Sequence, residues 1–192
     1  AAEPPTEVRP IVGRDGTLTY AWNEESGRLS WLGRATMPDV RARALIDAFQ
    51  HGSRNALLHG FGQGAEIKLL LQRLAGYQGV FAVDETGWVV ALVLRIHQFT
   101  ADLRRGRLLI FTGSTAWDDL QDFLVEHDGF LTPERVLAWP WFDAAAVADV
   151  SDRLAAVGAA VSRHRVARIT EMRQERTAVA RSPLAVRRAH QP

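Results

Sequence analysis

The chain has 192 residues, a formal net charge of +1 and no cysteine, so we expect one ordinary domain with a short appendage and no disulfide, thiolate nucleophile or thiolate-bound metal. Hydrophobic residues make up 47% and charged residues 23%, which is typical of a folded globular protein and excludes a largely disordered chain. The near-neutral charge argues against a uniformly basic nucleic-acid binder, and the longest apolar run, residues 88–94, is too short to span a bilayer. We therefore expect a cytoplasmic protein with neither a membrane nor nucleic acid as its partner.

Residues 1–50 are expected to form a leader, a β-hairpin and a helix. Three prolines within residues 1–10 predict a frayed leader. Residues 18–22 and 29–32 have the composition of strands, and the polar stretch between them ends in glycine, as is typical of a hairpin loop. The first folded element is thus predicted to be a small hairpin.

A short amphipathic helix is expected between this hairpin and Gly52. Pro38 suits the first helical position, and Asp39 suits the first turn because an acidic side chain there faces the positive end of the helix dipole. The spacing of apolar residues predicts a buried face made of Ala44, Leu45, Ala48 and Phe49.

Strand and helix patterns alternate through residues 51–142, which we expect to form the core. The expected strands are residues 56–58, 80–83, 108–111 and 136–139, and the helices between them begin after the glycine cluster, near Gly87 and at Ser114 or Thr115. Strands that alternate with helices pair in parallel and are covered by helices on both faces. The predicted fold class is α/β, with a Rossmann-like three-layer parallel sheet.

Residues 143–192 predict a long C-terminal helix and a basic tail. Val147, Val150, Leu154, Val157 and Val161 recur at alternating spacings of three and four, which is the heptad pattern of a helix packed along another helix. The pattern also suits an oligomerisation or docking element, which would include a homo-oligomer formed through this helix. Arginines dominate the residues that follow, and we interpret them as a solvated helix end rather than as an arm that binds nucleic acid or phosphate.

The most specific motif is the glycine cluster after the first core strand, Gly60-Phe61-Gly62-Gln63-Gly64. Small residues here let the backbone turn tightly and present N–H groups, at the positive end of a helix, to an anionic or polar ligand. The cluster matches the GxGxG loop of S-adenosylmethionine-dependent methyltransferases, and with Ala65 it also matches the GxGxxA form of the dinucleotide-binding motif. In the alternative interpretation the glycines only permit a tight strand-to-helix connection.

An acidic pair, Asp84 and Glu85, follows the second core strand. An acidic residue at this place binds ribose hydroxyls in either cofactor class. We therefore predict that the pair and the glycine cluster form one binding site for S-adenosylmethionine or a nucleotide. The alternative is that the pair caps the following helix.

The sequence assigns no catalytic residue and no metal ligand. His59, His97, Asp102 and His127 lie near the ends of elements without forming a constellation of acid–base groups, and we expect capping or surface roles for them. The aromatic residues 139–142 are expected to be core groups rather than the wall of a ligand site. Because the α/β pattern ends before the strands that a complete methyltransferase or dehydrogenase needs, the chain alone is not expected to be a complete enzyme; any activity would be that of a transferase.

Three segments, residues 55–66, 80–85 and 106–113, together resemble the N-terminal Rossmann-like domain of bacterial glycosyltransferases of the motility-accessory-factor type. Such a domain precedes or accompanies a separate transferase domain that modifies surface or flagellar proteins with sugars. The resemblance implies an accessory module with a glycosyltransferase domain or protein as its partner. Only the glycine cluster and the acidic pair match the nucleotide-binding-like loop of that family, and its transferase residues have no counterpart here.

A second class stays open, namely a methyltransferase that binds S-adenosylmethionine, or its degenerate relative. In such a protein the glycine cluster would hold the amino-acid portion of the cofactor, and Asp84 or Glu85 would hold its ribose. The third core strand ends in Thr112, Gly113 and Ser114, where those enzymes often place an acidic residue near the adenine.

Overall fold

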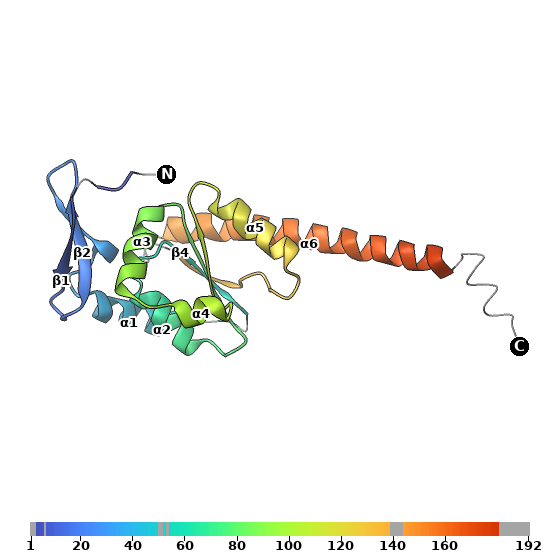
Figure 1. Cartoon of the computed structure of the whole chain (residues 1–192), viewed down its shortest axis with the longest axis horizontal. Coiled ribbons are helices and arrows are strands. Elements are labelled where there is room, and N and C mark those ends of the chain that lie inside the picture. Colours follow the sequence, from blue (N-terminus) through green and yellow to red (C-terminus); the bar gives the residue numbers. More distant parts are fainter. Residues whose placement is uncertain (1–2, 6, 50–51, 53, 139–143, 181–192) are drawn as a thin grey trace, which may run out of the picture.

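The computed structural model describes residues 3–5, 7–49, 52, 54–138 and 144–180. Within them, a three-stranded antiparallel sheet is followed by an α/β part with a four-stranded parallel sheet and then by a long helix (Figure 1). The prediction of an α/β fold with a parallel sheet, an N-terminal hairpin and a long C-terminal helix is confirmed.

The parallel sheet has the strand order β6-β5-β4-β7. Its strands are β4 (Ala56–His59), β5 (Val80–Asp84), β6 (Leu108–Thr112) and β7 (Arg135–Ala138). The connecting helices are α2 (Ala65–Arg73), α3 (Gly87–Ile96), the short α4 (Thr100–Arg104), which the sequence did not predict, and α5 (Ala116–Glu126). The chain winds outward from β4 to β5 and β6 and then returns to the other side of β4 for β7, so the winding direction changes between β4 and β7.

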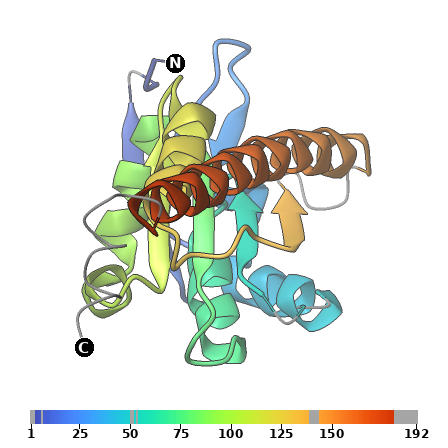
Figure 2. The ribbon, with the colours of Figure 1, turned by 90° about the vertical axis from the view of Figure 1, so that its right-hand side faces the viewer.

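Helices cover both faces of this sheet, and alternate residues of each strand point to opposite sides. Leu58 and Ala82 point toward a core that includes α2, α3 and the N-terminal sheet. Leu57 and Phe81 point toward a second core that includes α5 and the C-terminal helix. Figure 2 shows the sheet with that long helix crossing one face. Because all four strands are parallel, their carboxyl ends lie at the same edge of the sheet.

The N-terminal sheet corrects the expectation of a leader that is frayed through residue 10. Its strands are β1 (Val8–Val12), β2 (Leu18–Asn23) and β3 (Leu29–Trp31). The last two form the predicted hairpin, but β1 pairs with β2, and Pro10 lies opposite Tyr20. A proline is tolerated there because β1 is an edge strand and the missing N–H removes no bond that the sheet needs.

Helix α1 (Pro38–Ala48) begins at the predicted proline and buries only part of the predicted face, since Leu45 is buried and Phe49 packs on the core. A 3₁₀ turn, η1 (Leu32–Arg34), precedes it. The buried residues include Ala42, Leu45 and Ile46, whereas Ala44 and Ala48 are exposed. Contact with α2 decides the orientation of the helix, since Arg73 of α2 donates a hydrogen bond to the carbonyl oxygen of Ile46 at 2.8 Å.

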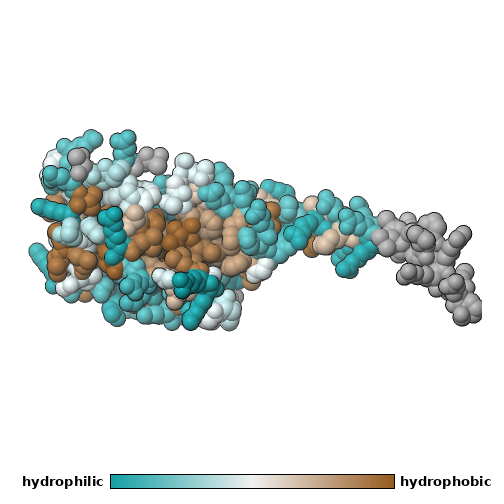
Figure 3. Space-filling view, in the orientation of Figure 1, coloured by the Kyte–Doolittle hydropathy of each residue, from teal (hydrophilic) through white to brown (hydrophobic). Residues whose placement is uncertain are grey.

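The C-terminal helix, α6 (Ala144–Ala180), is continuous over 37 residues. Its heptad valines and leucine are buried against α5 and the sheet, from Val150 to Val161. Because this stripe packs within the chain, it cannot also pack against a second copy. A homo-oligomer formed through α6 stays a prediction, and it would have to use the part of α6 that projects beyond the core (Figure 1). That part is largely hydrophilic, whereas apolar side chains gather on the globular part beside α3 (Figure 3).

Two of the arginines beyond the heptad stripe hold α6 on the core. Arg165 donates to the carbonyl oxygens of Leu124 and Phe130 at 2.9 and 3.0 Å. Arg168 forms an ion pair with Asp128 at 2.9 Å. Residues 181–192, the rest of the predicted basic tail, lie outside the described residues, as do the aromatic residues 139–142. Among the described helices, none has the length and apolar character needed to cross a membrane.

Candidate functional site

The glycine cluster forms the turn between β4 and α2, as predicted. Gly60, Gly62 and Gly64 have φ angles of 79°, 54° and 95°, which lie in the left-handed region that favours glycine. Gly64 has a second constraint, because a Cβ atom there would lie 2.5 Å from Cγ1 of Val93 and 2.8 Å from Cδ2 of His97. Backbone conformation and the close approach of α3 therefore account for these glycines without any ligand.

Several backbone N–H groups of the turn already have partners within the chain. Phe61 N–H donates to the carboxylate of Asp84 at 3.0 Å. Gly64 N–H donates to Glu66 at 2.9 Å, and Ala65 N–H donates to the side-chain oxygen of Gln63 at 3.3 Å. These are the groups that would bind a phosphate at the start of a helix. A phosphate could reach them only by displacing these side chains.

Glu66 places a buried carboxylate at the positive end of α2. Its exposed fraction is 2%, and this burial raises its pKa to about 7 even though the backbone N–H groups of Glu66, Gly64 and Gln63 stabilise the charged form. Sequence reasoning missed this residue. Its signal was an acidic residue in the first turn of a helix that follows a glycine loop, where it can take the place of a bound anion.

Gln63 fastens the N-terminal sheet to the glycine turn. Its side chain is 1% exposed, and its amide donates to the carbonyl oxygen of Leu18 in β2 at 3.1 Å. On the same side, a Cβ atom added to Gly33 of η1 would lie 3.0 Å from the backbone nitrogen of Gln63. The hairpin and η1 therefore cover this part of the turn.

We expect Gln63→Ala to loosen that attachment and to lower the free energy of unfolding by about 2 kcal/mol, because Ala65 N–H and the Leu18 carbonyl both lose a buried partner. Hydrogen exchange measured by mass spectrometry should show faster exchange in β1–β3 than in β4–β6. Gln72→Ala, which changes an exposed glutamine of α2, is the matched control. Equal exchange in the two variants would contradict the role given to Gln63.

The two members of the acidic pair differ in burial, since Asp84 is buried and Glu85 is half-buried. Asp84 is 7% exposed and accepts hydrogen bonds from Phe61 N–H and from Thr86 N–H at 2.7 Å. Burial raises the pKa of Asp84, although these two bonds oppose the rise. The carboxylate thus joins β5 to the glycine turn and also binds the amide that precedes α3, which is close to the capping role given as the alternative.

Glu85 instead belongs to a polar cluster with His59, Trp117 and Arg153. One carboxylate oxygen lies 3.0 Å from Nε2 of His59, and the other accepts a hydrogen bond from the Trp117 indole at 3.1 Å. Arg153 of α6 reaches the second oxygen at 3.4 Å. Burial by itself would raise the pKa of Glu85, but the hydrogen bond to its own backbone, the charge on His59 and the bond from Trp117 lower it below the ordinary value.

Among the acid–base residues that the sequence singled out, the structure brings only His59 to this edge of the sheet. Its ring stacks on Trp117 at 5.9 Å, and its Nδ1 atom is buried without a hydrogen-bond partner within the described residues. Nε2 of His97 contacts the carbonyl oxygen of Gln63 at 3.2 Å, and burial lowers its pKa. His127 stacks on Phe123.

A pocket of about 380 Å³ opens at the carboxyl ends of β4 and β5. Five of the predicted site residues line it, namely Gly60, Phe61, Gly62, Asp84 and Glu85, whereas Gln63 and Gly64 lie outside the lining. His59 also lines the pocket. The structure therefore brings most of the predicted residues together around one cavity.

Three tryptophans that sequence reasoning missed form much of the remaining wall. Trp22 and Trp31 come from β2 and β3, and Trp88 comes from the first turn of α3. The rings of Trp22 and Trp88 meet edge to face at 5.2 Å, and the indole N–H of Trp88 is buried without a partner within the described residues. No local motif indicates this wall, because tertiary packing alone brings the N-terminal sheet to the glycine turn.

Carboxylates dominate the charges in the pocket lining. Glu24 joins Asp84 and Glu85 there, and Arg34 is the cation that faces them from η1. The Ser30 hydroxyl contacts Glu24 and lowers its pKa. An acidic, tryptophan-lined cavity suits a ligand with a planar or cationic group and with hydroxyls that donate hydrogen bonds.

Comparison of the chain with protein-family models, with curated proteins and with solved structures finds no match. Within the described residues, no group of three or more histidine, aspartate or glutamate side chains could hold a metal ion.

Proposed function

We propose that the chain is an accessory domain with a Rossmann-like core, that it belongs to a larger bacterial glycosyltransferase-like protein, and that its pocket binds a nucleotide-containing ligand. The 380 Å³ pocket carries the proposal, because the glycine turn and the acidic pair meet there at the carboxyl ends of parallel strands. The order β6-β5-β4-β7 corresponds to the 3-2-1-4 part of a doubly wound nucleotide-binding sheet. Transfer chemistry would belong to the domain that this one accompanies.

The tryptophans and Glu85 define how such a ligand would bind. A purine or pyrimidine ring packs against the exposed faces of the indoles, as bases do on aromatic side chains. Glu85 keeps its carboxylate charged and accepts hydrogen bonds from ribose hydroxyls in place of the long contact from Arg153. Asp84 holds the turn in place.

Glu66 favours a second candidate within the same site, a protein that binds S-adenosylmethionine. The side chain of Glu66 at the start of α2 already accepts the Gly64 N–H that a pyrophosphate would need. S-adenosylmethionine has no phosphate, and its sulfonium is attracted by carboxylates and indole faces. We therefore expect it to bind more tightly than NAD or nucleotide sugars.

Calorimetric titration of the chain with S-adenosylmethionine, S-adenosylhomocysteine, NAD and nucleotide sugars tests both candidates. We expect Trp31→Ala to weaken binding at least tenfold, about 1.4 kcal/mol, because Trp31 lines the pocket without packing on another described ring. Tyr77→Ala is the matched control, since this aromatic residue is 82% exposed and precedes β5 at the opposite edge of the sheet.

Preferential binding of S-adenosylmethionine that Trp31→Ala weakens would select the second candidate. Binding of a nucleotide sugar with the same sensitivity would select the glycosyltransferase-associated domain. If none of the ligands gives a binding signal, or if Trp31→Ala leaves binding unchanged, a nucleotide site in this pocket would be refuted.

A further inference from the structure

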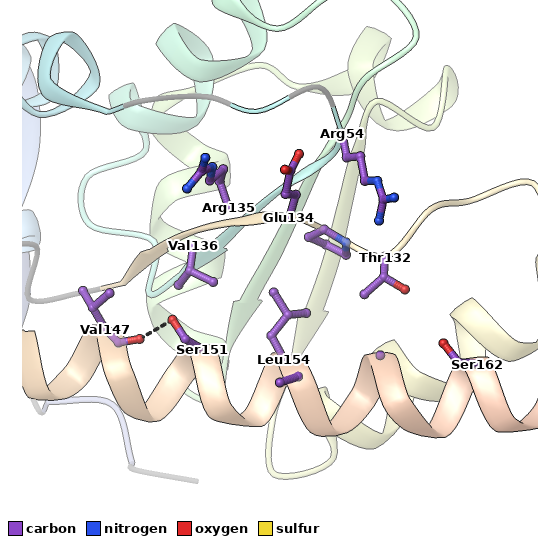
Figure 4. A pocket seen from close by; sticks show the side chains of 12 residues that line it. Arg54, Thr132, Glu134, Arg135, Val136, Val147, Ser151, Leu154 and Ser162 are labelled. Atoms are coloured by element: carbon purple, nitrogen blue, oxygen red, sulfur yellow. Dashed lines mark hydrogen bonds between the residues drawn. The ribbon is translucent and has the colours of Figure 1, made fainter.

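The two edges of the parallel sheet direct their backbone groups differently. At one edge, Ala56 N–H of β4 donates to the carbonyl oxygen just before β5 at 3.0 Å, so the next residue, Leu57, faces β7. Arg135 and Leu137 of β7 therefore direct their N–H and C=O groups inward to Leu57. The last residue of β7, Ala138, is fully buried, and a groove of about 570 Å³ lies between this strand and α6 (Figure 4).

At the other edge, β6 directs backbone groups away from the sheet. The carbonyl oxygen of Arg107 accepts a hydrogen bond from the first residue of β5 at 2.7 Å, and Gly113 N–H donates to the last residue of β5 at 3.3 Å. Alternate residues of a strand direct both backbone groups to the same neighbour, so the odd-numbered residues of β6 face β5. Ile110 and Thr112 therefore direct their N–H and C=O groups outward, where no described strand pairs with them.

The surface beside β6 is apolar on the side of α3. Ile110 is half-buried against the core on this side, and Thr112 is exposed. Leu94 of α3 and Leu103 of α4 are 43% and 39% exposed. Leu94 lies two turns after Gly87, where a Cβ atom would lie 3.5 Å from Oγ1 of Thr112, so both residues are on the face of α3 nearest β6. In the view that Figures 1 and 3 share, apolar side chains gather between α3 and α5. An uncovered apolar edge is a template for another strand.

Helix α5 makes the opposite side of the same edge acidic. The helix has no lysine or arginine, and it carries four exposed carboxylates that form no ion pair within the described residues, namely Asp118, Asp119, Asp122 and Glu126. Phe123 packs over β6, since its ring lies 5.8 Å from that of Phe111. Helical spacing places Asp119 and Glu126 on either side of Phe123. Lysine or arginine side chains could reach these carboxylates while their stems cover the apolar surface.

We propose that β6 binds an extended segment of another polypeptide, in which basic side chains directed toward α5 alternate with apolar side chains directed toward Leu94. Pairing with Ile110 and Thr112 supplies affinity, and the alternation supplies specificity. A second copy of the chain complements the edge poorly, because antiparallel pairing of two β6 strands places the same faces together and brings the carboxylates of both α5 helices into one surface. β6 does not line the nucleotide pocket, and the proposal does not rest on that pocket.

Two eight-residue peptides test the proposal, one alternating lysine with valine and the other alternating glutamate with valine. The measurement is amide hydrogen exchange of the full chain by NMR. In the chain alone, the outward amides of Ile110 and Thr112 should exchange faster than those of Leu109 and Phe111, which face β5. The lysine peptide should slow exchange at Ile110 and Thr112. The glutamate peptide is its matched control and should not, because it has the same alternation with the opposite charge.

Variants separate strand pairing from charge. Thr112→Pro should abolish binding of the lysine peptide because it removes an outward N–H group at an exposed position, which an edge strand tolerates. Thr112→Ala keeps that N–H group and should keep binding. Glu126→Gln should weaken binding several-fold through the lost charge, whereas Glu25→Gln, which changes an exposed carboxylate between β2 and β3, should leave binding unchanged.

No binding of the lysine peptide, equal binding of both peptides, or binding that leaves the Ile110 and Thr112 amides unprotected would overturn the proposal. Equal loss of binding in Thr112→Pro and Thr112→Ala would also overturn it, because the site would then recognise the threonine side chain without strand pairing. Sedimentation equilibrium of the chain alone covers the remaining occupant: a concentration-dependent dimer that Thr112→Pro abolishes would make the edge a contact between two copies and refute a basic partner strand.

Discussion

Replacing Gly64 by alanine is expected to lower the free energy of unfolding by about 4 kcal/mol, combining the cost of a left-handed alanine with that of overpacking. The φ angle of Gly64 is 95°. An added Cβ would meet Val93 of α3 at 2.5 Å and His97 at 2.8 Å, so α2 and α3 would have to separate. Urea unfolding followed by tryptophan fluorescence measures the loss.

Gly113 provides the matched control for this substitution. Its φ angle is 90°, but a Cβ atom there would meet no atom within 4 Å. Gly113→Ala should therefore cost only the backbone term, about 1 to 2 kcal/mol. Equal losses at the two glycines would contradict the packing of Gly64 on α3. If Gly64 were a glycine only to make room for a ligand, Gly64→Ala would cost no more than Gly113→Ala in the ligand-free chain.

The second large effect is a fall in stability with rising pH that originates at Glu66. The pKa of Glu66 is about 7 in the folded chain, against an ordinary value of 4.5. A raised folded pKa means that the unfolded chain releases this proton first, so stability is full below pH 4.5 and is lost as pH rises through about 7. The loss from this group alone reaches about 3 kcal/mol above that range.

Glu66→Gln isolates this contribution, because glutamine keeps an oxygen that can accept the Gly64 N–H and has no proton to release. Urea unfolding of both proteins from pH 4 to pH 8 gives two stability curves whose difference removes the effects of Asp84, His97 and the other common groups. The difference should change by about 3 kcal/mol between pH 4.5 and pH 7. A constant difference would show that Glu66 stays charged in the folded chain.

Local chemistry made several elements of this fold predictable. Pro38 marks the start of α1, and the glycines at residues 60, 62 and 64 mark the turn that joins a buried strand to a helix. Short apolar runs separated by helical spacing identified the strands of the parallel sheet. β1 escaped prediction because Pro10 is unfavourable in most strands and is tolerated here only at an edge.

Local sequence could not predict which face of α1 is buried or what the heptad stripe of α6 packs against. Ala44 and Ala42 differ little in chemistry, and the position of α2 decides which of them is buried. A heptad stripe has the same pattern whether it packs on a second copy or on the same chain. Here Leu154 and its neighbours pack on α5 and the sheet, a choice that depends on contacts distant in sequence.

The sequence by itself determined the class of the fold, the glycine turn and the acidic pair that follows β5, because each depends on conformational preferences within a few residues. Only the tertiary structure decided what those groups contact. It turned Asp84, Gln63 and Glu66 toward the amides of the turn and brought Trp22, Trp31 and Trp88 to the pocket. The physical reason is that buried N–H groups must find acceptors. Gln63 and Glu66 supply them from two residues away, whereas Asp84 and the three tryptophans reach the turn only through packing between segments distant in sequence.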